Sequence, residues 1–154
     1  MAFCFAADRT LGKLAKWLRI LGFDTNVELD VPADRLYTHV EKDRIVLTRT
    51  VAIKKHFKTH RLVFITSNHL DVQLRQVITE IGICPADTRP FSRCIHCDVP
   101  IVDAAPEDVC GLIPDYICET HNEFQKCLQC NRIFWPGSHT IRSLERIEQL
   151  FDLI

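Results

Sequence analysis

Two pairs of cysteines constrain the second half of this chain more than any other feature. Each pair has two residues between its cysteines, with Cys94 and Cys97 in the first pair and Cys127 and Cys130 in the second. A Cys-x2-Cys turn brings two sulfurs to one metal ion, and two such turns supply the four ligands of a tetrahedral zinc site. Because four cysteines close such a site, whereas a catalytic zinc keeps one position open, the spacing predicts a structural zinc.

The region around these cysteines needs a source of stability. Residues 91–139 contain scattered proline, aspartate and cysteine with little sustained periodicity, which predicts only a small core. Zinc binding contributes about 10 to 16 kcal/mol to the folding of small modules of this kind. Four buried thiols or a redox-active pair are the alternatives, and His96, His121 or His139 are candidates to replace one cysteine.

The remaining four cysteines have no paired spacing. Cys110 and Cys118 are expected to be packed or partly exposed thiols rather than ligands, and Cys4 and Cys84 stand alone. Eight cysteines without a recognisable secretion signal favour metal binding over a disulfide framework and predict a cytoplasmic protein. Apolar runs fall well short of the roughly 18 residues of a membrane span, so we expect no membrane partner.

The first part of the chain alternates between short apolar runs and helical periodicity. Strands are expected at 2–7, 25–29, 44–47 and 62–65. The helices are expected at 32–41, 48–58 and 70–81, and over an earlier apolar stripe that Gly22 ends, made of Leu11, Leu14, Ala15, Leu18 and Leu21. Strands that alternate with helices are typical of the α/β class, in which a parallel sheet is flanked by helices.

A linker at 85–90 divides the chain into two predicted domains. Residues 1–88 form the α/β domain, and residues 91–154 form a zinc ribbon that ends in a helix carrying Ile141, Leu144, Ile147 and Phe151. Residues 1–90 carry 14 basic and 10 acidic side chains, whereas residues 91–154 carry 5 and 10. The basic first part is compatible with a polyanionic partner, and the zinc ribbon is a candidate platform for a protein partner.

Carboxylates follow several of the predicted strands. In an open parallel sheet, ligands bind beyond the carboxyl ends of the strands. Asp8 follows the first strand, Asp71 the last, and Asp34 or Asp30 lies between them, so these groups are candidates to hold Mg²⁺ or Mn²⁺ for cleavage of a phosphodiester. Capping of helix N-termini by the same carboxylates is the alternative. Neither a GxGxxG nor a P-loop motif is present, so nucleotide binding of those kinds is excluded.

Basic residues accompany Asp8 on the first predicted helix. Arg9, Lys13 and Lys16, with Arg19, place positive charge opposite the apolar stripe, as an RNA-binding surface requires. A solvated helix face explains the same pattern, because no aromatic residues interleave with these charges for base stacking. Lys54, Lys55, Lys58 and Arg61 form a second basic patch with the same two interpretations.

Four segments together resemble one known family. Residues 8–24 (DRTLGKLAKWLRILGFD) closely resemble the opening of the mut-seven C-terminal type of PIN-like ribonuclease domain. Residues 44–49 (RIVLTR) resemble its third-strand motif, and residues 91–94 (FSRC) with Cys97 resemble its first cysteine turn. The second turn, with residues 134–139 (FWPGSH), completes a match that spans nearly the whole chain in order.

This resemblance implies a PIN-like α/β domain fused to a zinc ribbon, with metal-dependent RNA cleavage as the expected activity. The family's first acidic position falls on Asp8 and a second falls on Asp34. A third does not carry over, because Thr50 stands where the family usually has aspartate and a hydroxyl adds no charge. Asp98 likewise stands where asparagine is common. We therefore expect a ribonuclease weakened by Thr50, or alternatively an inactive module that binds RNA or protein.

Overall fold

The computed structural model describes residues 2–28, 41, 43–55 and 61–153. Residues 32–40 of the helix expected at 32–41, the last three residues of the one expected at 48–58, and both Asp30 and Asp34 lie outside this described part of the chain. None of the helices described here is long and apolar enough to cross a membrane.

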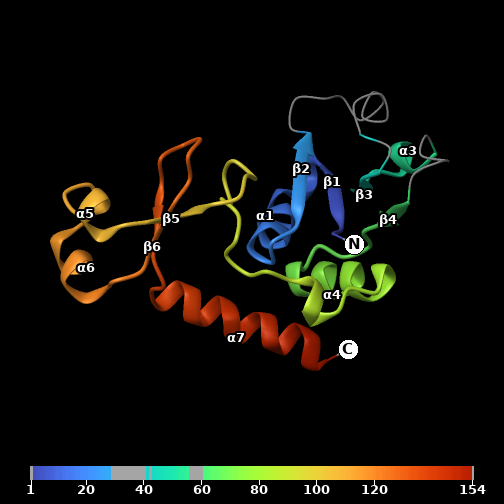
Figure 1. Ribbon diagram of the computed structural model, residues 1–154. Coiled ribbons are helices and arrows are strands. Elements are labelled where there is room, and N and C mark those ends of the chain that lie inside the picture. The colour runs from blue at the N-terminus through green and yellow to red at the C-terminus, as the bar shows by residue number, and fades with distance from the viewer. Residues whose placement is uncertain (1, 29–40, 42, 56–60, 154) are drawn as a thin grey trace.

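A four-stranded parallel sheet forms the first half of the molecule (Figure 1). Its strands are β1 (Cys4–Asp8), β2 (Asp24–Glu28), β3 (Ile45–Thr48) and β4 (Leu62–Phe64), in the order β2-β1-β3-β4. All neighbouring strands run parallel, which confirms the α/β class. Because β1 lies between β2 and β3, Asp8 ends a central strand directly beside the end of β3.

Helices cover both faces of this sheet. α1 (Gly12–Ile20) and α4 (Leu70–Ile81) pack on one face, and the predicted stripe from Leu11 to Leu21 is buried there. On the other face Ala6 and Val46 pack against Ile53 of α3 (Val51–Lys54). The predicted helix at 70–81 is confirmed with the same bounds, since its apolar positions keep helical spacing for three turns.

The second half contains a smaller antiparallel sheet. Its strands are β5 (Val102–Ala104), β6 (Phe124–Lys126) and β7 (Ile133–Phe134). Two short helices, α5 (Pro106–Val109) and α6 (Asp115–Thr120), connect β5 to β6 and pack through Val109 and Ile117 on Phe124. Cys110 and Cys118, expected as separate thiols, instead form a disulfide that joins these two helices.

The C-terminal helix α7 (Ser138–Asp152) extends from the antiparallel sheet toward α4 (Figure 1). Ile147 and Leu150 are buried in the core of the parallel sheet. Ile141 and Leu144, expected on the same buried stripe, are exposed because only the second half of the helix reaches that core. The periodicity thus predicts the helix correctly, but only part of its apolar stripe is buried.

The predicted linker is bonded to the first helix. The backbone N–H of Arg89 donates to the carbonyl of Leu21 at 2.8 Å, and that of Phe91 donates to the carbonyl of Ile20 at 2.9 Å. This close approach needs Gly22, whose φ is +95° and whose added Cβ would lie 2.4 Å from the carbonyl oxygen of Arg89. The proposed boundary between the two domains, at 88–91, falls in this segment.

A Gly22→Ala substitution tests this contact. We expect it to lower the free energy of unfolding by about 2 kcal/mol or more, because the new Cβ meets both a left-handed backbone and a carbonyl oxygen. Gly12→Ala is the matched control, since Gly12 has helical dihedrals and open space around its Cβ position. That control is expected to be neutral or to stabilise by up to about 1 kcal/mol, and denaturant unfolding of both variants compares them.

Candidate functional site

The four paired cysteines form one cluster. Their ligand atoms all lie within 4.8 Å of one another, and Sγ of Cys94 lies 3.8 Å from Sγ of Cys130. Zinc–sulfur bonds of about 2.3 Å at tetrahedral angles require sulfurs about 3.8 Å apart. Within the described residues this is the one group of three or more potential ligands, and it contains none of the three candidate histidines. The donor set and its spacing therefore fit a structural zinc.

The two cysteine turns have the same backbone geometry. In the first turn, the N–H of Asp98 donates a hydrogen bond to the carbonyl of Cys94 at 2.9 Å. In the second turn, the N–H of Asn131 donates one to the carbonyl of Cys127 at 2.8 Å. Asp98 and Asn131 have φ of 57° and 61°, in the left-handed region that Asn and Asp adopt more readily than other non-glycine residues. This explains why a short polar residue follows each cysteine pair.

Two thiols of the cluster have strongly shifted pKa values. Burial, with hydrogen bonds to neighbouring thiols, raises the pKa of Cys97 to about 12. A backbone hydrogen bond from Arg132 lowers the pKa of Cys130 to about 6, against the opposing effect of burial. A bound divalent cation would stabilise the thiolate form of each sulfur that it binds.

Asp98 also connects the first cysteine turn to the parallel sheet. Its carboxylate accepts a hydrogen bond from the N–H of Thr25 at 2.8 Å and pairs with Arg93 at 3.0 Å and Arg19 at 3.6 Å. Arg19 further donates to the carbonyls of Thr25 and Ile95. The side chain of Arg19, predicted to contact RNA, is only 15% exposed and is taken up by these internal contacts.

A second polar cluster surrounds Asp8 at the carboxyl end of the parallel sheet. The Asp8 side chain is buried and accepts hydrogen bonds from the N–H and hydroxyl of Thr10 on one oxygen. The other oxygen accepts from the hydroxyl of Thr48 at 2.6 Å, the N–H of Arg49 at 3.1 Å and the hydroxyl of Thr50 at 3.5 Å. Asp8 therefore caps the turn that begins the first helix, which was the alternative to metal binding.

Of the other predicted carboxylates, Asp71 lies within the described residues, where no group of three or more potential metal ligands contains Asp71 or Asp8. Asp71, in the first turn of α4, forms an ion pair with Arg146 of α7. The guanidinium of Arg146 lies 4.7 Å from the ring centroid of Trp17, so this pair fastens α7 to α1 and α4. Asp34 lies outside the described residues, and its role as a second acidic position stays a prediction.

Three of the four basic side chains predicted to contact RNA are exposed. Arg9, Lys13 and Lys16 are exposed, while Leu14, Ala15 and Leu18 on the opposite side are buried. Arg9 directly follows Asp8, so positive charge stands at the same edge of the sheet as the buried carboxylate. This arrangement suits a phosphate backbone that crosses the edge.

Comparison with protein families identifies one match. The model of the Mut7-C RNAse domain matches residues 4–147. The chain belongs to this family. Comparisons with curated proteins and with solved structures gave no significant match. The match includes both cysteine turns and the Asp8 edge, which confirms the resemblance drawn from the sequence, and its description indicates an RNase-type domain for which RNA is the expected class of partner.

Removal of one cysteine tests the metal centre. We expect one zinc per chain in the purified protein and its loss in Cys127→Ser, with a fall in thermal stability, because three sulfurs leave the tetrahedral site open. Cys84→Ser is the matched control, as Cys84 is an exposed thiol outside the cluster. Elemental analysis measures both variants, and full zinc occupancy in Cys127→Ser would contradict the assignment.

Proposed function

We propose that this chain is a weakened ribonuclease, which binds RNA at the carboxyl edge of its parallel sheet and cleaves it slowly. The observation that carries this proposal is the buried Asp8 carboxylate at the end of a central strand, with exposed Arg9 beside it and Lys13 and Lys16 along the next helix. Membership of the Mut7-C RNAse domain family supports RNA as the substrate class.

The described residues at this edge fit Mg²⁺ or Mn²⁺ poorly. Hard divalent cations bind several carboxylate and water oxygens, and Asp8 is the one carboxylate in the hydrogen-bonded cluster. Its two oxygens offer about four lone-pair positions, which five donors of the chain already share. We attribute the proposed low activity to this arrangement and to the hydroxyl at position 50.

The same observation favours a second candidate function, an RNA-binding module that does not cleave. In that case Asp8 serves only to hold the loop after β3 and the start of the first helix, as its contacts with Thr48 and Thr10 already do. The two functions differ in whether the chain cleaves RNA, and a carboxylate added at position 50 should make slow cleavage large enough to measure.

The Thr50→Asp substitution distinguishes them. The Thr50 hydroxyl lies 3.5 Å from Asp8 Oδ2, so the new carboxylate faces Asp8 and the pair repel each other unless a cation lies between them. We expect Mn²⁺ to raise the melting temperature of the variant more than that of the parent protein, and to raise RNA cleavage by about tenfold or more.

Two controls accompany this variant. Val51→Asp adds the same charge one residue further along on an exposed side chain, and it should gain neither effect. Asp8→Asn in the Thr50→Asp background should abolish both effects, provided that zinc content shows a folded protein. If Thr50→Asp binds Mn²⁺ yet leaves RNA intact, the non-cleaving module is the correct function.

The basic surface is tested by charge reversal. Lys13→Glu with Lys16→Glu should reduce the slope of log affinity against log salt for single-stranded RNA by about 1.4, the value for two lost phosphate contacts. Arg89→Glu with Arg142→Glu, which reverses two exposed charges outside α1 and the cysteine cluster, should leave the slope unchanged. Equal slopes for both double variants would show that the α1 face is merely solvated.

A further inference from the structure

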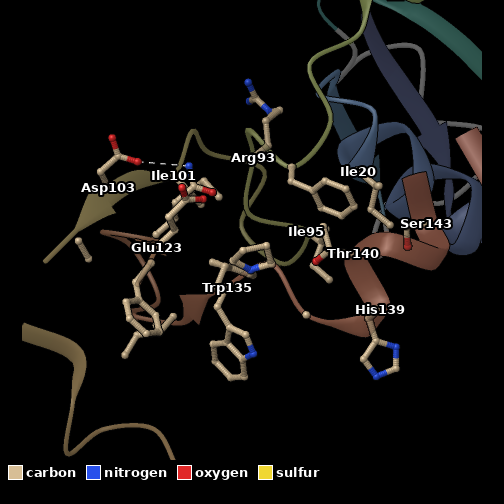
Figure 2. Close-up of a pocket in the computed structure, with 18 of the residues that line it drawn as sticks. Ile20, Arg93, Ile95, Ile101, Asp103, Glu123, Trp135, His139, Thr140 and Ser143 are labelled. Carbon is tan, nitrogen blue, oxygen red and sulfur yellow. Dashed lines mark hydrogen bonds between the residues drawn. The ribbon is translucent and has the colours of Figure 1, made fainter. Parts of the chain in front are cut away.

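A cavity of about 830 Å³ lies where the two halves of the molecule meet. Its walls come from the antiparallel sheet, the segment of the first cysteine turn and the start of α7, with one residue of α1 (Figure 2). Figure 2 shows Ile20, Ile95 and Trp135 entering from three of these segments. The volume is within the range of ligand-binding pockets, and the walls are mostly apolar.

The polar groups around this cavity carry a negative charge. Asp103 and Glu123 are exposed at its border and form no ion pair within the described residues. The charge of Arg93, which also lines the cavity, is balanced by Asp98 at 3.0 Å and Asp24 at 3.8 Å. Asp103 also accepts a hydrogen bond from the side chain of Gln125 at 3.5 Å. The cavity thus combines apolar walls, an indole and two carboxylates that lack a cationic partner in the described residues, and this combination complements a cationic and apolar ligand.

The cavity is remote from the Asp8 edge. Ile20, which lines it, is the last residue of α1, whereas Asp8 precedes the first turn of that helical segment. A helix of nine residues spans about 13 Å, so α1 separates the two places. The cavity therefore lies away from the edge at which RNA cleavage is proposed.

Two features of its lining have no role in the metal centre. Residues 134–139, which carry part of the family resemblance, supply Trp135, Pro136 and His139 to the cavity although none of them is a ligand. Phe91, which lines the cavity and packs against the core of the parallel sheet, adopts a φ of 60°, a conformation that costs a bulky residue about 1 to 3 kcal/mol. Strained residues of this kind are concentrated at binding sites.

We propose that this cavity binds a segment of a partner protein in which arginine or lysine alternates with large apolar residues. The apolar side chains would enter between Ile95 and Trp135, and the cations would pair with Asp103 and Glu123. An RNA strand is a poorer occupant, because its phosphates would meet these carboxylates and because residues 91–154 carry 10 acidic against 5 basic side chains. This inference is independent of the proposed ribonuclease activity.

Trp135 provides the signal for a direct test. The chain has two tryptophans, so Trp17→Phe leaves Trp135 as the one indole fluorophore. The probe is a blocked peptide of about eight residues in which arginine and leucine alternate, added to the zinc-loaded protein. We expect a saturable change in fluorescence, and no saturable change with a peptide in which glutamate replaces arginine.

Matched charge variants complete the test. Asp103→Asn with Glu123→Gln should weaken binding of the arginine–leucine peptide about tenfold, because both pairing carboxylates are lost. Glu107→Gln with Asp108→Asn removes the same charge from exposed α5, outside the cavity lining, and should weaken binding by less than about twofold.

Three outcomes would overturn the proposal. They are the absence of saturable peptide binding, an equal loss in the two double variants, and displacement of the peptide by a single-stranded oligouridylate that itself saturates the Trp135 signal. The last outcome would assign the cavity to RNA instead. Peptide binding that persists in Lys13→Glu with Lys16→Glu would show that the result does not depend on the RNA-binding surface.

Discussion

The contacts of the Asp98 carboxylate hold the first cysteine turn against the parallel sheet, and the placement of the cysteine cluster depends on them. Asp98 follows the second cysteine of the first turn and reaches the N–H of Thr25 in β2, while Arg93 and Arg19 approach it from the turn segment and from α1. Burial raises the pKa of Asp98 against the charges of both arginines, so the network gains little net stability from its charges. Its contribution is to specify one arrangement, because removal of Asp98 would leave the largely buried Arg19 without an ion-pair partner in the described residues.

The two ends of the parallel sheet carry different polar groups: arginine–aspartate ion pairs lie at the amino end, and the hydrogen-bonded Asp8 lies at the carboxyl end. At the amino end, Arg44 pairs with Asp24 at 2.6 Å and donates to the carbonyl of Phe5, so three strands are connected there. Burial opposes ionisation of Asp24, but the hydrogen bond and charge of Arg44, with the charge of Arg93, outweigh it and lower the pKa of Asp24. The amino end thus joins the sheet to the cysteine turn, and the proposed contact with RNA lies at the opposite, carboxyl end with Asp8.

Local patterns in the sequence predicted the features that depend on local spacing. The stripe from Leu11 to Leu21, the helix at 70–81 and the four cysteines follow from helical period and ligand spacing, and the structure contains all three. Arg19 follows the same helical pattern as Lys16, yet it lies near the end of α1, where Thr25 and Ile95 offer carbonyls that periodicity cannot reveal. The disulfide between Cys110 and Cys118 was not predicted, because the two cysteines are brought together by the short helices α5 and α6. With four and six residues, these helices carry too little periodicity to be recognised in the sequence.

The sequence could identify Asp8 but could not decide what its carboxylate does, because that depends on hydroxyls brought in by a neighbouring strand. Thr48 and Thr50 approach Asp8 only because β3 lies beside β1 in parallel register. A hydroxyl that donates to a carboxylate satisfies a buried charge without adding another, so this edge is stable without a cation. An aspartate at position 50 would reverse that balance, since two adjacent carboxylates need a cation between them. One side chain therefore determines whether the same backbone presents a hydrogen-bonded cap or an incomplete metal site.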